Sequence, residues 1–230
     1  MATILSIETS TNVCSVAVAQ DNHVIFRNED YKGPSHAVQC GLFVEEALSF
    51  AESHAIPLDA VAVSEGPGSY TGLRIGVSMA KGVAYGRNIP LIAIPTLQLL
   101  CVPVLLYHEE IPENALYIPM LDARRMEVYS AIYDRSLKEV RGIQADIVTA
   151  ETYQEYLDKG PVVFFGNGSD KARTVITSAN AQFIPDIVPL ATDMIALAER
   201  SHLQRDFIDL AYSTPNYLKD FQATKPKSQL

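Results

Sequence analysis

The feature that most constrains the fold is an order of segments that occurs twice in the 230 residues. Each half has three β-rich segments, a helix, a buried strand, a glycine loop and a second helix. In the first half these are residues 3–8, 13–19, 23–31, 35–54, 58–64, 65–70 and 71–86, with a strand at 91–94. In the second half they are residues 116–121, 127–133, 137–148, 151–157, 161–165, 166–169 and 171–179. Short polar turns between the first three segments of each half predict an antiparallel meander.

The two glycine loops support the duplication, because both read Gly-x-Gly-Ser between a buried strand and a helix. They begin at Gly66 and Gly166. Two βββαβα halves facing each other define the actin-like, or ribonuclease-H-like, α/β class. We therefore expect two lobes, residues 1–102 and 103–230, with a ligand cleft between them, since clefts often form at domain interfaces.

Composition limits the partners and the compartment. Hydrophobic residues make up 48% of the chain, enough for packed cores, and the net charge is −9. An acidic surface is repelled by phosphate backbones, so we expect RNA to be reached only indirectly, through another subunit. The cysteines, Cys14, Cys40 and Cys101, are scattered and odd in number, which fits the cytoplasm.

An apolar stretch at residues 89–107 is long enough to cross a bilayer, which takes about 20 residues. Pro90, Pro95 and Pro103 interrupt it, and no basic cluster flanks it. We interpret it as a buried strand followed by a helix from about residue 97, kinked near Pro103, and expect no membrane association.

The first glycine loop resembles a dinucleotide fingerprint but spaces its glycines as G-x-G-x-x-x-G, and no acidic residue ends the next strand. It also lacks the Gly-Lys-Ser/Thr of a P-loop. The helix start near Ser69 could still hold an anion. The alternative is that Ser69 or Thr71 simply caps the helix.

The helix at 71–86 carries a stripe of small residues every four positions: Gly72, Gly76, Ala80 and Ala84. Interior glycines cost about 1 kcal/mol each relative to alanine, and close approach of another helix would offset that cost. An apolar stripe lies beside it. The alternative is close packing on the chain's own sheet.

The helix at 35–54 is apolar on most sides near its start, so one sheet face would not cover it. Together the two helices predict a surface that packs against another subunit. The predicted partner-interface residues are His36, Cys40, Phe43, Ala47, Gly72, Ile75, Gly76, Met79, Ala80 and Val83.

Motifs for catalysis are weak. The five histidines form no i,i+4 pair and no Gly-x-Ser-x-Gly elbow occurs, so neither a metal site nor a nucleophile is predicted. Glu8 and Asp122 each end a strand where an actin-like cleft would lie, and two carboxylates there could hold magnesium and phosphate. A small-molecule kinase or ATPase is thus an alternative. Otherwise Asp122 caps a turn and Glu8 accepts loop amides.

Several segments together resemble the TsaB family over essentially the whole chain. They are residues 7–10 (IETS), 66–76 (GPGSYTGLRIG), 80–82 (AKG), 121–129 (LDARRMEVY), 166–168 (GNG) and 215–218 (PNYL). The first glycine block is the most specific of them.

The resemblance implies a non-catalytic subunit of the machinery that makes threonylcarbamoyladenosine in tRNA. It implies a heterodimer with a TsaD-type transferase, assembly with a TsaE-type ATPase, and a homodimer when alone. The transferase branch has a His-x-x-x-His after the strand that matches 91–94, whereas residues 95–100 here read PTLQLL. We therefore expect no metal and no cofactor of its own, with ATP and metal acting through the partners, and no peptidase activity.

Overall fold

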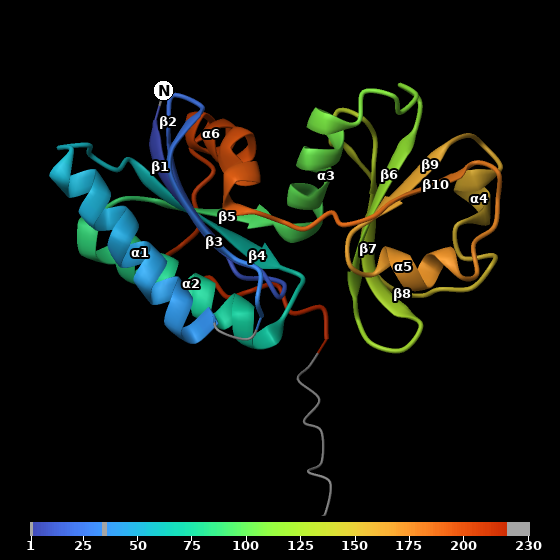
Figure 1. Ribbon diagram of the computed structural model, residues 1–230, viewed down its shortest axis with the longest axis horizontal. Helices are drawn as coiled ribbons and strands as arrows, with labels where there is room; N and C mark the ends of the chain where they lie inside the picture. Colours follow the sequence, from blue (N-terminus) through green and yellow to red (C-terminus); the bar gives the residue numbers. More distant parts are fainter. Residues whose placement is uncertain (1, 34–35, 220–230) are drawn as a thin grey trace, which may run out of the picture.

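The computed structural model describes residues 2–33 and 36–219, which form two mixed sheets lying side by side (Figure 1). The first sheet contains β1 (Thr3–Glu8), β2 (Cys14–Gln20), β3 (His23–Asp30), β4 (Ala60–Gly66) and β5 (Leu91–Pro95). The second contains β6 (Leu116–Asp122), β7 (Glu127–Tyr133), β8 (Glu139–Ile147), β9 (Val162–Phe165) and β10 (Ala181–Ile184).

The two sheets have the same topology. Their orders are β3-β2-β1-β4-β5 and β8-β7-β6-β9-β10. In both, the first three strands pair antiparallel and the last two join in parallel. The predicted duplication and the two-lobed actin-like α/β class are confirmed.

Helices cover both faces of the first sheet. Figure 1 shows α1 (His36–Ser53) and α2 (Tyr70–Arg87) on its outer face, and α3 (Thr96–Tyr107) and α6 (Ile195–Gln204) on the other. A 3-10 turn, η1 (Ala191–Met194), precedes α6. Side chains in β1 alternate between the two cores, with Leu5 and Ile7 toward α1–α2 and Ile4 toward α3–α6. Burial on both faces explains why β1 reads as one continuous run rather than alternating.

Helix α3 lies between the two sheets, which explains its apolar sequence. Its Leu99 and Val102 pack in the core of the first sheet, whereas Leu97, Leu100 and Val104 pack in a core with the second. A helix covered on both sides has no polar face to show. Among the described residues, no helix combines the length and apolar character that crossing a membrane requires.

The second lobe has shorter helices than the sequence predicts. These are α4 (Gln154–Leu157) and α5 (Ser169–Arg173), against predicted helices at 151–157 and 171–179. β-Branched and small polar residues after Arg173 favour turns, so α5 stops early. The strand β10 and the helix α6 were not predicted, since neither has a long periodic pattern.

The chain returns to the first lobe after the second sheet. The amide of Ala2 donates to Glu199 on α6 at 3.2 Å, and Ile208 N donates to the Leu91 carbonyl at 2.9 Å. The predicted lobe boundary after residue 102 falls inside α3, which contacts both sheets.

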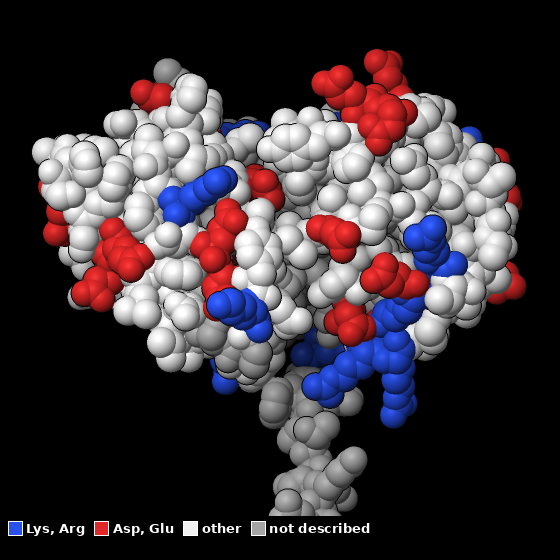
Figure 2. Space-filling model, in the orientation of Figure 1, with Lys and Arg blue, Asp and Glu red and all other residues white. Residues whose placement is uncertain are grey.

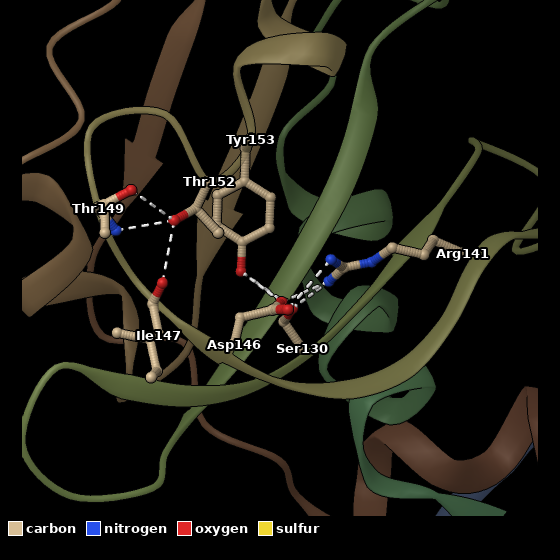
Figure 3. Close-up of polar contacts among 7 residues, drawn as sticks. All are labelled: Ser130, Arg141, Asp146, Ile147, Thr149, Thr152 and Tyr153. Carbon is tan, nitrogen blue, oxygen red and sulfur yellow. Dashed lines mark hydrogen bonds and ion pairs between the residues drawn. The ribbon is translucent and has the colours of Figure 1, made fainter.

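A polar network holds β7, β8 and the segment before α4 together in the second lobe (Figure 3). Arg141 forms an ion pair with Asp146 at 2.5 Å, and the Tyr153 hydroxyl donates to Asp146 at 2.8 Å. Ser130 donates to the same carboxylate at 2.5 Å. Burial alone would raise the pKa of Asp146, but the hydrogen bonds from Arg141, Ser130 and Tyr153 lower it.

Candidate functional site

The predicted partner-interface residues all lie on α1 and α2, and the structure divides them into two groups. Six are buried within the first lobe: His36, Cys40, Ala47, Gly72, Gly76 and Ala80. The other four are half-buried at the surface: Phe43, Ile75, Met79 and Val83. The prediction that the stripe Gly72, Gly76 and Ala80 faces a partner is therefore corrected, because its close approach is internal.

The turn between β1 and β2 is what approaches that stripe. A Cβ on Gly72 would lie 2.0 Å from the Thr9 carbonyl oxygen, and one on Gly76 would lie 2.2 Å from Thr9 Oγ1. Thr9 also donates to the Gly72 carbonyl at 2.7 Å, while His36 Nε2 lies 2.6 Å from the Thr11 carbonyl oxygen. These glycines are required so that α2 can lie directly on the turn.

A different stripe of small residues faces outward on α2. Ser78, Gly82 and Gly86 are exposed, and a Cβ at either glycine would meet nothing within 4 Å. On α1, Val38 is 64% and Leu42 47% exposed, although both are apolar and lie one turn apart. Sequence periodicity alone predicted the wrong stripe of small residues as the outward one. In the structure, the outward side is marked by helix glycines with open space and by exposed apolar side chains.

The expected anion-binding groups at the start of α2 are engaged within the chain. Ser69 Oγ accepts a hydrogen bond from Gly72 N at 3.2 Å, so Ser69 is the N-cap of α2. Its own amide donates to the Ser10 carbonyl at 2.6 Å, and a Cβ on Gly68 would lie 2.4 Å from the same oxygen. The glycine loop therefore packs on the β1–β2 turn.

The second glycine loop repeats this packing, which extends the duplication to the loops. Gly66 and Gly166 both have positive φ, 117° and 91°. Gly168 N donates to the Met120 carbonyl at 3.0 Å, so this loop also closes on the first strand of its lobe.

Glu8 is fully buried at the end of β1. Its Oε1 accepts the Ser10 amide at 2.5 Å, while Oε2 has no partner among the described residues. Burial raises the pKa of Glu8 to about 7, and the nearby Asp193, whose own pKa burial raises to about 7, adds to the shift. Glu8 therefore accepts a loop amide, as the alternative to a cleft carboxylate predicted, although it is fully buried.

Asp122 lies in a different environment from Glu8. It forms an ion pair with Lys171 and accepts the Arg124 amide at 3.0 Å, so it caps the β6–β7 turn. No contact joins it to Glu8 within residues 2–33 and 36–219. The same residues contain no group of three or more His, Cys, Asp or Glu side chains placed to hold a metal ion.

A surface hollow with a volume of about 700 Å³ lies elsewhere on the first lobe. Its walls come from the β2–β3 turn, β3, α3, η1 and α6, and include Arg27, Leu106, Asp193 and Arg200. It is thus separate from the outward α1–α2 face and from the β6–β7 turn.

Residues 213–219 form a strap that joins the two lobes. Asn216 N donates to the Glu65 carbonyl at 2.7 Å, and Tyr217 OH accepts from Arg74 Nε at 3.2 Å. Two residues on, Lys219 forms an ion pair with Glu127 on β7. The strap contains the PNYL segment, whose role the sequence did not reveal.

The sequence profile of the TsaD family, described as tRNA N6-adenosine threonylcarbamoyltransferase, matches residues 31–227. A Bacillus subtilis protein described as tRNA threonylcarbamoyladenosine biosynthesis protein TsaB is 30% identical over 81% of this chain and 76% of its own length. The Escherichia coli protein of that name is 27% identical over 96% of both chains.

Solved structures agree on the fold. YeaZ from Pseudomonas aeruginosa superposes with a TM-score of 0.79 at 22% identity, covering 95% of this chain and all of that one. A polyphosphate/ATP-glucomannokinase from Arthrobacter has a TM-score of 0.51 at 11% identity, covering 89% of this chain and 100% of that one. These matches, together with the duplicated topology, show that the chain belongs to the TsaB family.

Proposed function

We propose that this chain is a non-catalytic subunit in the synthesis of threonylcarbamoyladenosine in tRNA, and that it pairs with a TsaD-type transferase through the outward face of α1 and α2. The named relatives support the pathway. The observation that carries the pairing is the outward side of both helices, where Gly82 and Gly86 on α2 have open space and Val38 and Leu42 on α1 are exposed. An uncovered face of this kind gains free energy when another helix covers it.

The engaged loops support a role without chemistry of its own. In the first lobe, the glycine loop and the β1–β2 turn hydrogen-bond to each other, and Ser69 caps a helix. In the second, Asp122 is paired with Lys171. Groups already satisfied within the chain must break those bonds before they bind phosphate, which disfavours the kinase alternative.

Further partners follow from the same proposal. We expect a TsaE-type ATPase to join the pair, with ATP and metal acting through the partner subunits. Alone, the chain would form a homodimer through the same α1–α2 face, because an uncovered apolar face favours self-association. The proposed location is the cytoplasm.

The test is co-purification of the chain with its cognate transferase and measurement of the complex mass. Three variants, Val38→Glu, Leu42→Glu and Gly82→Arg, place charge or bulk on the outward face. The present side chains there contact little of their own lobe, so the monomer should stay folded. Val140→Glu, at a 48% exposed valine on β8, is the matched control for Val38→Glu.

We expect the three α1–α2 variants to lose pairing and the Val140→Glu variant to keep it. Pairing that survives all three variants, with far-ultraviolet circular dichroism unchanged, would rule out this face. An isolated chain that binds ATP, and stops binding it in an Asp122→Ala variant, would favour the kinase alternative.

A further inference from the structure

We propose that the β6–β7 turn, together with the strap at 213–219, binds the phosphate backbone of RNA, and this rests on the proposed role in tRNA modification. The proposal concerns five cationic side chains, called here the basic rim: Arg74, Arg124, Arg125, Lys171 and Lys219. It changes the expectation that RNA is reached only through a partner.

A chain of contacts connects the residues that carry these five side chains. Arg124 and Arg125 form the turn itself, and Lys171 Nζ donates to the carbonyl oxygen of Arg125 at 2.9 Å. Lys219 pairs with Glu127 at the end of the same turn. Tyr217, two residues before Lys219 and hence at most about 7 Å away along the chain, holds Arg74. Arg74 therefore extends the basic rim to the first lobe.

The basic rim is locally positive, whereas the molecule as a whole is negatively charged. The net charge is −9, yet this contact chain joins five cations to only two carboxylates, Asp122 and Glu127. Figure 2 shows lysine and arginine gathered at the lower edge of the second lobe, beside the opening between the lobes. A local positive surface on an acidic protein attracts a polyanion to that edge and leaves the rest of the molecule repelled by it.

Two arginines of the basic rim are free to bind. Arg124 and Arg125 are exposed, and neither guanidinium has a hydrogen-bond or ion-pair partner in the described part of the chain. By contrast, Lys171 is saturated by Asp122 and by the carbonyl oxygens of Arg125 and Glu127, so its role is to fix the turn. Guanidinium groups bind phosphate through two parallel hydrogen bonds, which a fixed turn can direct.

The backbone of the turn adds an independent observation. Arg124 and Arg125 both have positive φ, 70° and 47°. This conformation is unfavourable for arginine and easy for glycine or asparagine. Two successive arginines in it cost stability, and the turn is held in this form by Asp122, which accepts the Arg124 amide, and by Lys171, which donates to the Arg125 carbonyl. Backbone strain of this kind is typical of functional positions.

Arg74 offers a further contact on the other lobe. Its guanidinium carbon lies 4.3 Å from the centre of the Tyr70 ring and its Nε donates to the Tyr217 hydroxyl, while the residue as a whole is exposed. The Tyr70 and Tyr217 rings are 4.8 Å apart. Arg74, held by these two rings, can contact the backbone of an RNA strand on the first lobe.

The test measures binding of fluorescently labelled, unfractionated tRNA to the full chain, alone and paired with the transferase, between about 50 and 200 mM salt. Arg124→Glu/Arg125→Glu should weaken binding at least about tenfold and reduce the salt dependence by about one to two released ions. Arg200→Glu/Arg205→Glu is the control, since it makes the same charge change at two exposed arginines near the end of α6, one of them also at positive φ.

A second variant separates binding from folding. Arg124→Asn/Arg125→Gly suits the left-handed backbone, so the thermal midpoint should rise by roughly 2–4 °C while tRNA binding falls. The inference is overturned if both turn variants bind tRNA like the control pair. It is also overturned if inorganic phosphate at millimolar concentration, or vesicles of anionic lipid, displace the labelled tRNA as well as unlabelled tRNA does. If the turn variants pair normally with the transferase and bind tRNA unchanged, this inference alone is wrong. If the α1–α2 variants keep pairing with the transferase while the turn variants lose tRNA binding, only the proposed function is wrong.

Discussion

The hydroxyl oxygen of Thr9 lies 2.2 Å from the position that a Cβ atom would take on Gly76. Thr9 is fully buried and its hydroxyl also bonds to Gly72, so it cannot move aside freely. Gly76→Ala should therefore lower the free energy of unfolding by about 1–3 kcal/mol, as overpacking does. Urea unfolding checks this, and a Gly76→Ala variant as stable as the natural chain would contradict the packing described here.

Gly82 provides the opposite case on the same helix. A Cβ there meets nothing, so Gly82→Ala should raise the free energy of unfolding by about 0.5–1 kcal/mol through helix propensity. The same urea experiment compares the two variants directly. If Gly82→Ala destabilised the isolated chain as much as Gly76→Ala, the outward position of Gly82 would be wrong.

The raised pKa of Glu8 predicts that the stability of the fold depends on pH. Its pKa is raised from 4.5 to about 7 in the folded chain, so folding favours the neutral form. The stability of the natural chain should therefore be lost as pH rises from 4.5 to 7, by up to about 3 kcal/mol from this group. Glu8→Gln removes the ionisation and should gain stability relative to the natural chain at pH 8, but little at pH 4.5.

Urea unfolding of both proteins at the two pH values measures this difference. Glu113→Gln, at an exposed carboxyl, is the control and should show no such pH dependence. An equal effect of Glu8→Gln at pH 4.5 and pH 8 would mean that folding does not raise the pKa of Glu8.

The Arg141–Asp146 pair predicts the reverse trend. The folded chain lowers the pKa of Asp146 below 3.8, so its contribution is present above that value and lost as the pH falls through the lower folded pKa. Asp146→Asn should cost about 3 kcal/mol at pH 7, because Arg141 is left without its counter-charge. The cost should shrink near pH 3.

Calorimetry at the two pH values tests this, with Arg141→Met/Asp146→Leu as the comparison. Removing both charges should cost less than removing one, since no buried charge remains unpaired. A double variant less stable than Asp146→Asn would contradict the ion-pair explanation and assign the loss to packing.

The fold was largely predictable because its signals are local. The repeated order of β-rich segments and helices, with a Gly-x-Gly-Ser loop in each half, predicted both sheets before any tertiary contact was known. The β10 strand and the α6 helix were not predicted, because each is short. The α6 helix is also held by a distant part of the chain, since the Ala2 amide donates to Glu199 across 197 residues.

The candidate site was predicted only in part. Helical periodicity identified α1 and α2 as helices with more apolar surface than one sheet covers. It also identified the wrong stripe on α2 as the outward one, because Gly76 and Gly82 have the same composition signal. Only the position of Thr9 distinguishes them, and it comes from a turn that lies 67 residues before Gly76 in the sequence.

The sequence by itself determined the duplicated α/β architecture, the apolar character of the two helices and the family, since each depends on patterns within short stretches. Only the tertiary structure decided which glycines are buried, that Glu8 is fully buried, and that a chain of contacts connects Arg74 with the turn at Arg124. Burial, and with it the pKa of Glu8, is a property of how distant segments pack, and no local pattern encodes that distance.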